Sequence, residues 1–499
     1  MICSTEEFRG LLKAARRAGT PLLAIRTADP ASAIAQATAS IGEQSALLMW
    51  DLMLGIRGIN KAGAQVVTDR FGETTALGPS DVLAATRKLE KEDAILFLSN
   101  AHRFWDQPDV VQAIWNVRDP FKSGGQSLVL LSTPGAVLPA ELQGDVMIID
   151  EPLPSAEELA ELVRRLCEDA ELCVPSEEIV SACVDALIGL AAFPAEQVLA
   201  LALSKNGVDV ERLWERKRQA IEQTPGLSIW RGGETFADIG GCETIKHFLR
   251  AVLGGREAPR VIVFVDEIEK AFAGTGTDLS GVKTEMTGTM LSWMQDSNAD
   301  GIVLIGPPGA AKSAIAKAAG NSAGIPTVAF DLSAMQSGIV GGSGERLRTA
   351  LQVVDAISQG RSLWIATCNS IGSLPPELRR RFTLGTFFFD LPSAEERAVI
   401  WEIYRAKWAL DGDIPKDEGW TGAEIKECCR KAWRLNLSLS ESAQYIVPVA
   451  RSAADQIERL RQQASGRFLS ASQPGVFEVG RDTPAVAAKR VFREVTLNE

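Results

Sequence analysis

Histidine is scarce in this chain of 499 residues, which has two histidines and eight cysteines, and no two cysteines form a Cys-x-x-Cys pair. Structural zinc sites use cysteine and histidine ligands at close spacings, so a zinc-binding domain is not expected. Scattered cysteines are typical of reduced, mostly buried thiols in a cytosolic protein. We therefore expect a cytoplasmic protein without a cysteine–histidine metal site.

Long apolar runs and an excess of positive charge are also absent. No stretch approaches the ~18 consecutive apolar residues of a membrane span. The N-terminal MICSTEEFRG lacks the basic-then-apolar pattern of a signal peptide. The net charge is −12, whereas a broad nucleic-acid surface needs clustered lysine and arginine. We expect no membrane partner, and nucleic acid is the less expected kind of partner.

The composition is that of a globular protein, with 46% hydrophobic and 23% charged residues. At about 100–200 residues per domain, the length predicts two to four domains. Apolar runs of strand length alternate with longer helical patterns, which predicts an α/β fold with parallel sheets. The strand candidates are 21–25, 46–51, 94–99, 127–132, 146–150, 261–266, 301–306, 327–332, 362–367 and 386–391.

The two halves of the chain repeat one plan. The segment 147–166 parallels 387–405: each has an apolar strand, an acidic turn with proline, a serine helix cap, a glutamate three residues later, and an amphipathic helix. Helical sequence follows in both halves. The predicted division is an α/β domain (1–154), its helical lid (155–225), a second α/β domain (226–392), its helical lid (393–465) and a C-terminal tail (466–499).

The segment GIVLIGPPGAAKSAIAKAAG predicts a strand, a phosphate-binding loop and a helix. The loop pattern GxxxxGK[ST] runs from Gly306 to Ser313, except that Ala311 replaces the glycine before the lysine. Backbone N–H groups of the loop and the positive end of the following helix would face a phosphate. Lys312 would reach the β- and γ-phosphates of ATP, and the Ser313 hydroxyl would bind Mg²⁺. Ala311 requires a backbone that avoids a strongly glycine-only conformation, and a reduced affinity for the nucleotide is the expected consequence. The predicted contacts with the nucleotide are Pro308, Gly309, Ala310, Ala311, Lys312, Ser313 and Ala314.

An acidic pair stands upstream of this loop, in RVIVFVDEIEKAFAG. At the end of a buried strand, Asp266 would hold the Mg²⁺ shell and Glu267 would polarise the attacking water. No apolar run between Asp331 and Asn369 ends in Asp-Glu, although that is where the acidic strand of such ATPases normally lies. We conclude that the acidic strand precedes the phosphate loop in this chain.

A parallel sheet tolerates this change of order. The usual ATPase sheet has the spatial order 5-1-4-3-2, and moving strand 3 to the front gives the chain order 3, 1, 2, 4, 5. The connections from 3 to 1 and from 2 to 4 then cross the sheet in the same directions as before. Because parallel crossovers are right-handed in ~98% of cases, each helix keeps its face of the sheet. The sequence therefore predicts a permuted strand order with an unchanged site.

The second half resembles an AAA ATPase domain in six segments, of which the phosphate loop is Walker A and the acidic strand is Walker B. The other matching segments are FADIGG (236–241), LWIATCN (363–369), LPPELRRRF (374–382) and WTGAEIKECCRKA (420–432). The whole chain resembles a two-domain AAA family of cyanobacteria and plastids. The resemblance implies two tandem domains of this type, each with a small helical lid, the second with permuted strand order.

The resemblance also implies roles for residues outside the loop. Backbone near Asp238, Ile239 and Gly240 would contact adenine, and Asn369 would be the polar sensor near the γ-phosphate. Gly422 and Ala423 occupy the second-sensor position of the lid. Arg380 or Arg381 would be the arginine finger that completes the site of a neighbouring subunit, although adjacent arginines are also common on solvated surfaces.

The first half of the chain resembles the same domain, but it lacks the residues that would bind and hydrolyse ATP. The segment 24–34 has neither glycine nor lysine where a phosphate loop would lie, and Asn100-Ala101 stand where Asp-Glu would be. The resemblance implies a degenerate domain that docks or assembles rather than hydrolyses ATP.

The function expected from these features is that of a Mg²⁺-dependent ATPase, a homo-oligomeric and hexameric ring motor that remodels a protein partner. Segment 335–345 would line the central pore, with Ile339 and Val340 in place of an aromatic grip. A nucleic-acid motor ranks second, because the loop segments IVGGSG (339–344) and GTGTDLSG (274–281) contain no lysine or arginine. The third hypothesis is a scaffold that binds ATP and hydrolyses it slowly, because Ala311 replaces a glycine of the phosphate loop.

Overall fold

A computed structural model describes residues 4–41, 44–72, 78–89, 92–205, 207–272, 282–297, 299–335, 342–370, 372 and 376–480. The chain divides into two compact units, of which the first holds Met1–Ile229, Gly274–Ala299 and Val328–Ser362. The second holds Trp230–Ala273, Asp300–Thr327 and Leu363–Glu499. The five domain ranges expected from the sequence remain predictions.

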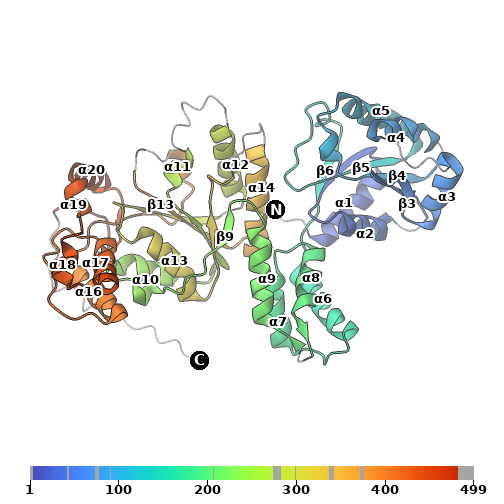
Figure 1. Ribbon diagram of the computed structural model, residues 1–499. Coiled ribbons are helices and arrows are strands. Elements are labelled where there is room, and N and C mark those ends of the chain that lie inside the picture. Colours follow the sequence, from blue (N-terminus) through green and yellow to red (C-terminus); the bar gives the residue numbers. More distant parts are fainter. Residues whose placement is uncertain are drawn as a thin grey trace. The chain divides into compact units, whose positions relative to one another are not determined.

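The N-terminal part of the chain forms a six-stranded sheet with the order β3-β2-β4-β5-β1-β6 (Figure 1). All its pairings are parallel except that of β2 with β3. Its strands are β1 (Leu22–Arg26), β2 (Ala46–Asp51), β3 (Gly55–Gly58), β4 (Ala94–Leu98), β5 (Ser127–Ser132) and β6 (Met147–Asp150). Five of the six were predicted; β3 was missed because its two glycines weaken the strand pattern.

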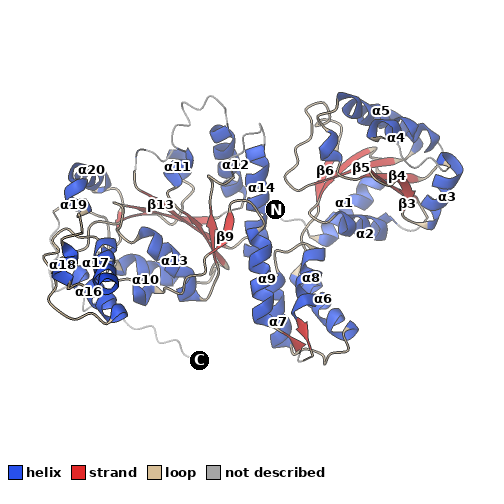
Figure 2. Ribbon diagram, viewed as in Figure 1, coloured by secondary structure: helices blue, strands red, loops and turns tan. Residues whose placement is uncertain are grey.

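Helices cover both faces of this sheet, and alternating residues of each strand supply the two cores. Figure 2 shows α1 and α2 on one face, and α4 and α5 on the other. Leu23, Ile25 and Phe97 pack with α1 and α2, whereas Leu22, Leu96 and Leu98 pack on the opposite side. The helices are α1 (Thr5–Arg17), α2 (Pro30–Ile41), α3 (Lys61–Phe71), α4 (Pro79–Ala85), η1 (Thr86–Leu89), η2 (Ala101–Phe104) and α5 (Pro108–Gly124).

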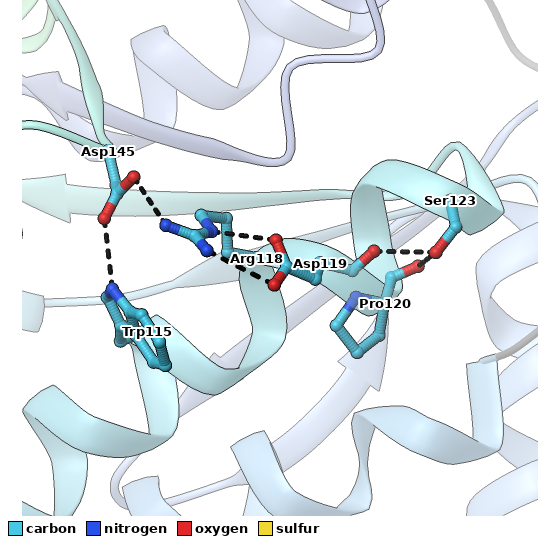
Figure 3. Close-up of polar contacts among 6 residues, drawn as sticks. All are labelled: Trp115, Arg118, Asp119, Pro120, Ser123 and Asp145. Atoms are coloured by element: carbon cyan, nitrogen blue, oxygen red, sulfur yellow. Dashed lines mark hydrogen bonds and ion pairs between the residues drawn. The ribbon is translucent and has the colours of Figure 1, made fainter.

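A polar cluster ties the end of α5 to the segment that enters β6 (Figure 3). The carboxylate of Asp145 accepts hydrogen bonds from Trp115 Nε1 at 3.1 Å and from Arg118 Nη1 at 2.8 Å. Pro120 lies inside α5 and has no N–H to donate to the preceding turn. The Ser123 hydroxyl supports this turn by donating to the Asp119 carbonyl at 2.7 Å. These bonds set the position from which β6 starts.

A helical bundle follows, with its own buried core. Its elements are α6 (Ala156–Asp169), α7 (Glu177–Leu187), α8 (Ala192–Ala202), β7 (Leu203–Ser204), β8 (Gly207–Val208) and α9 (Val210–Glu222). The predicted serine cap of α6 is present: Ser155 Oγ accepts from the Glu158 N–H, and the Glu158 carboxylate accepts from the Ser155 N–H. Ser393 and Glu396 make the same reciprocal pair at the start of α16 (Ala394–Trp408). The structure thus confirms the repeated helix start that the sequence predicts.

The second sheet has seven strands in the order β15-β14-β11-β13-β10-β12-β9. They are β9 (Leu227–Ile229), β10 (Val261–Val265), β11 (Asp300–Ile305), β12 (Thr327–Phe330), β13 (Ser362–Cys368), β14 (Thr386–Phe388) and β15 (Leu469–Ser470). The predicted spatial order 5-1-4-3-2 corresponds to β14, β11, β13, β10 and β12, and these strands stand in that order. β10, which bears the acidic pair, therefore lies between β13 and β12.

Helices of this half lie between and after the strands. They are η3 (Phe236–Asp238), α10 (Glu243–Leu253), α11 (Ile268–Phe272), α12 (Val282–Asp296), α13 (Lys312–Ala323), α14 (Gly342–Ser358) and α15 (Pro376–Arg379). A second helical bundle holds α16 (Ala394–Trp408), α17 (Gly422–Leu435), α18 (Leu439–Ala443), α19 (Val449–Ser452) and α20 (Ala454–Ala464). Within the described part of the chain, no helix has both the length and the apolar character to cross a membrane.

The tail expected after residue 465 folds back onto the sheet in its described part. β15 pairs in parallel with β14, and the Ala471 N–H donates to the Phe388 carbonyl at 3.0 Å. The ring of Phe477 packs on that of Phe388, with centroids 4.5 Å apart. Residues 481–499 lie outside the described residues.

Candidate functional site

The carboxyl end of β10 carries two acidic side chains. The strand is buried throughout, whereas Asp266 is exposed and Glu267 is half-buried. Glu267 has a φ of 47°, in the left-handed region that favours glycine. Such a backbone costs on the order of 1–3 kcal/mol in a residue with a side chain, and functional sites are where these costs concentrate.

The loop from Gly306 to Ala311 connects β11 with α13. A Cβ on Gly306 would lie 2.2 Å from the carbonyl oxygen of Phe389, so a side chain does not fit there. Ala311 has a φ of 66° and a ψ of 8° at the start of α13. The turn into α13 uses a left-handed backbone, which favours glycine but is also open to alanine, so the requirement of a backbone not restricted to glycine is met. Alanine adopts this conformation at a cost of about 1–2 kcal/mol.

The loop and the acidic strand meet through hydroxyl groups. Ser313 Oγ donates to Asp266 Oδ1 at 2.8 Å, and Thr367 Oγ1 donates to the same oxygen at 2.6 Å. Thr367 also accepts the Glu267 N–H at 2.9 Å. Thr367 lies on β13, between β11, which leads into the loop and Ser313, and β10, which the acidic pair follows. Its hydroxyl therefore holds both acidic residues in place.

This group suits Mg²⁺ by its chemistry. Mg²⁺ binds proteins through one or two carboxylates, keeps several waters and shares the phosphates of its nucleotide. Asp266 and Ser313 supply one carboxylate and one hydroxyl oxygen at a single point. In the described residues, no three histidine, cysteine or acidic side chains form a cluster that could enclose a metal alone. The site therefore fits a metal that arrives with phosphates.

The lysine of the loop is folded inward. Lys312 is 6% exposed, and its ammonium donates to the carbonyls of Gly306 at 2.7 Å and Pro307 at 2.8 Å. Burial lowers the pKa of Lys312 to about 8, and the carboxylate of Glu269 acts in the opposite direction. Of the other loop residues, Ala310 is buried, whereas Pro308 and Ala314 are exposed.

Asn369, at the end of β13, connects two acidic side chains. Its side-chain amide donates to Glu267 Oε1 at 3.0 Å, and its backbone N–H donates to Glu269 Oε1 at 2.9 Å. The exposed ammonium of Lys270 forms an ion pair with Glu267 Oε2. Glu267 is thus bound on both carboxylate oxygens.

Three segments of the chain match known families. Residues 6–151 match the N-terminal domain and residues 157–224 the second domain of SpoVK-like AAA ATPases. Residues 302–359 match the ATPase family associated with various cellular activities, AAA. This chain belongs to the AAA ATPase family. The AAA match begins in β11, so the acidic strand β10 precedes the matched segment.

Relatives of similar length carry the same family name. The chain is 24% identical over 443 residues to the AAA domain-containing protein ycf46 of Guillardia theta, covering 76% of this chain and 80% of the relative. It is 24% identical over 458 residues to ycf46 of Trieres chinensis, covering 79% and 85%. With ycf46 of Gracilaria tenuistipitata var. liui the identity is 25% over 362 residues, covering 63% and 66%.

The lid helices of this AAA domain contact the loop and the predicted adenine segment. The Ala423 N–H, next to Gly422, points to the Gly309 carbonyl at 3.4 Å. A Cβ on Gly240 would lie 2.6 Å from Ile400 of α16, so this backbone packs closely on the lid. The neighbouring Asp238 and Ile239 differ in exposure, since Asp238 is exposed and Ile239 buried. A cleft of about 320 Å³ opens beside Asp238, lined also by Glu234, Ile403, Tyr404, Lys407 and Lys426.

The three arginines differ in their surroundings. Arg380 is exposed, whereas Arg379 and Arg381 are half-buried. The Arg381 N–H of the backbone donates to the Leu378 carbonyl at 3.0 Å, which continues the turn after α15. Because a finger must reach another subunit, exposure favours Arg380 over Arg381. Residues 336–341 of the expected pore segment, including Ile339 and Val340, and segment 274–281 lie outside the described residues.

The first domain replaces the nucleotide site with contacts of its own. Only Thr27 to Asp29 connect β1 with α2, in place of the longer loop from Gly306 to Ala311. Asp29 Oδ1 accepts the Ser32 N–H at 3.2 Å, and Asp29 Oδ2 accepts the Phe193 N–H of α8 at 3.0 Å. A carboxylate thus joins this loop to the helical bundle, and its negative charge would repel a phosphate.

The acidic pair of the second domain has its backbone counterpart in Ser99-Asn100. β4 ends at Leu98 as β10 ends at Val265, so the second residue after the strand is Asn100 in one domain and Glu267 in the other. Both have left-handed backbones, with φ of 51° and 47°. The expected correspondence with Asn100-Ala101 was therefore one residue too late, because β4 ends at Leu98 and the polar Ser99 already lies outside the strand.

Sequence reasoning missed Thr367 and Glu269. Thr367 lies two residues before Asn369, in a strand that reads as a plain apolar run. Glu269 follows Glu267 by two residues, and on a helix this spacing separates side chains rather than bringing them together. A buried glutamate on the first turn of α11 is visible only once the helix is seen to pack against β13.

Proposed function

We propose that this AAA protein binds ATP with Mg²⁺ in its second domain and hydrolyses it as a ring motor that remodels a protein partner. The observation that carries the proposal is the bond of 2.8 Å between Ser313 and Asp266, one residue from Lys312. It brings together the hydroxyl, the carboxylate and the ammonium that phosphoryl transfer requires. The proposal includes a rearranged chain order, which the position of β10 between β13 and β12 supports.

Each residue has a defined task in this proposal. Lys312 exchanges the carbonyls of Gly306 and Pro307 for the β- and γ-phosphate oxygens. Glu267 accepts a hydrogen bond from the attacking water, and Asn369 orients the Glu267 carboxylate through its amide. Bound Mg²⁺ neutralises the charge that develops on the phosphates. Asp266 and Ser313 are the groups that would hold it.

The proposed assembly is a homo-oligomeric, hexameric ring. Exposed Arg380 supports it, because an arginine that completes a neighbour's site acts only in an oligomer. The degenerate first domain would serve docking or assembly. A cytoplasmic location, expected from scattered cysteines, is part of the same proposal; the described cysteines are free thiols.

A slow nucleotide-dependent scaffold is the second candidate function. It is favoured by the strained backbone of Ala311, which sets the loop that would wrap the phosphates. Firm ATP binding with turnover far below the usual ~1–100 s⁻¹ of phosphoryl-transfer enzymes would select it.

The decisive experiment measures ATP binding and hydrolysis for the full chain and for Glu267→Gln and Lys312→Ala. We expect Glu267→Gln to bind ATP without turnover, and Lys312→Ala to lose binding. Arg380→Ala is expected to reduce turnover without unfolding, with Arg381→Ala as its comparison. Unchanged hydrolysis in Glu267→Gln would remove Glu267 from its role. Stimulation by DNA or RNA at physiological salt would favour a nucleic-acid motor, and partners trapped by Glu267→Gln would identify a protein substrate.

A further inference from the structure

A buried glutamate next to the candidate site has no part in the proposed function. Glu269 lies on the first turn of α11 and is 8% exposed. One oxygen accepts the Asn369 N–H at 2.9 Å. Among the described residues, its other oxygen, Oε2, is buried and has no hydrogen-bond partner. A buried carboxylate is costly unless it is bonded, and each such group needs an explanation.

The contacts of Asn369 supply that explanation. Glu269 holds the backbone of Asn369, and the side chain of Asn369 holds Glu267 Oε1 at 3.0 Å. The loop after β13 therefore connects the two glutamates in one chain of hydrogen bonds. Loss of the first bond would free the Asn369 backbone and with it the amide that orients Glu267.

We propose that Glu269 is a positioning residue for ATP hydrolysis, which sets the orientation of Glu267 by holding the backbone of Asn369. The inference rests on the proposed function, since it assigns a task within that reaction. Glu269 touches neither nucleotide nor water in this scheme. Its effect through Asn369 therefore falls on turnover. The charge of Glu269 also acts on Lys312, and Glu269→Gln and Glu269→Leu both remove that charge, so any change in the affinity for ATP should be the same in the two variants.

The test compares Glu269→Leu with Glu269→Gln in the full chain. Leucine has a similar size and accepts no hydrogen bond, whereas glutamine keeps an oxygen for the Asn369 N–H. We expect Glu269→Leu to lower kcat by about 10–100-fold, as small displacements of catalytic groups do. Glu269→Gln should keep kcat within about threefold of the wild type, and the Kd of ATP should be the same in Glu269→Gln and Glu269→Leu.

A double-mutant cycle with Asn369→Ala separates positioning from general damage. If Glu269 acts through Asn369, kcat of the double variant Glu269→Leu/Asn369→Ala should be no lower than kcat of Asn369→Ala alone. If the reduction of kcat in the double variant equals the product of the two single reductions, the proposal is overturned. An unchanged kcat in Glu269→Leu would also overturn it. Equal losses in Glu269→Gln and Glu269→Leu would also overturn it, because they would show that the charge of Glu269 matters rather than its bond to Asn369.

Controls keep this proposal distinct from the proposed function. Asp417, in the lid, also accepts two bonds from its own bundle, from Arg397 and from Trp401 at 3.0 Å each. Asp417→Asn should lower the melting temperature and leave kcat unchanged. If Glu269→Leu does not fold, Glu269→Gln and the exchange rate of the Asn369 amide hydrogen decide the question. A wild type that hydrolyses no ATP overturns the proposed function, whereas an active wild type with a fully active Glu269→Leu overturns only this proposal.

Discussion

The hydroxyl of Ser313 donates a 2.8 Å hydrogen bond to the carboxylate of Asp266, although the two residues are 47 positions apart and follow β11 and β10, two strands that do not pair. β13 separates these strands, and its Thr367 hydroxyl donates to the same carboxylate oxygen at 2.6 Å. The candidate metal site is therefore assembled across three strands of the sheet, and its parts can be removed one at a time.

The first prediction concerns these three side chains. We expect Asp266→Asn to raise the Mg²⁺ concentration needed for half-maximal ATP hydrolysis by more than about 100-fold. Groups that only orient a metal ligand typically account for about 10–100-fold in metal affinity or activity. Thr367→Val removes the orienting hydroxyl at nearly constant side-chain size, and it should raise the same Mg²⁺ concentration by about 10–100-fold. Hydrolysis measured against Mg²⁺ concentration gives both numbers. An Asp266→Asn variant with wild-type Mg²⁺ dependence would exclude Asp266 as the ligand.

The second prediction concerns the strained backbone of Ala311. Ala311→Gly removes a side chain from a residue with a φ of 66°. Relief of the left-handed strain exceeds the added chain entropy of glycine, so we expect a net stabilisation of about 1 kcal/mol or less and tighter ATP binding. Ala310, which has no positive φ, is the matched control, and Ala310→Gly should destabilise the protein. Melting temperature and the Kd of ATP are the measurements. Equal effects of the two substitutions would contradict the strain argument.

The third prediction concerns Asp29, which caps two helices of the first unit. It accepts the N–H of Ser32 and the N–H of Phe193 in α8. We expect Asp29→Ala to destabilise this unit by about 1–3 kcal/mol, because two orphan donors lose their acceptor. Asp209→Ala, which removes the cap of α9 alone, should cost about 1 kcal/mol. Hydrogen exchange should report faster opening of α8 in the Asp29 variant only. If the amide hydrogens of α8 exchange equally slowly in both variants, Asp29 does not stabilise the helical bundle.

The fourth prediction is a pH dependence of stability from Lys217. This lysine is 4% exposed, and its ammonium donates to the Asp185 carbonyl at 2.9 Å. Burial lowers its pKa from 10.5 to about 7, and the charge of Asp185 opposes this shift. Between pH 7 and pH 10.5 the unfolded chain binds the proton that the folded chain has released. The free energy of unfolding should therefore rise with pH in that window, and the penalty of the buried charge is greatest below pH 7.

The measurement is the melting temperature of the wild type against Lys217→Met from pH 6 to pH 9. The stability of the wild type should rise relative to the variant above pH 7, by at most about 1.4 kcal/mol per pH unit. Lys61→Met, at an exposed lysine, should show no such trend. Parallel curves for the wild type and Lys217→Met would show that Lys217 keeps its ordinary pKa.

Much of the candidate site could be predicted because its residues directly follow strands that the sequence shows as apolar runs. Val261 to Val265 form a run of buried apolar residues, and the acidic pair follows it directly. The loop around Gly309 stands between a strand and an alanine-rich helix, which is the context that its motif requires. Glu269 and Asp29 could not be predicted, since each acts through a hydrogen bond to a residue about 100 or more positions away.

The sequence by itself determined which local segments become strands, helices and a phosphate loop, because apolar periodicity and helix caps act over a few residues. Only the tertiary structure decided that Thr367 holds Asp266 and that Glu269 reaches Asn369. These contacts depend on strand order and on how side chains from separate elements fill one space. That information is distributed over the whole sheet, so no short stretch of sequence contains it.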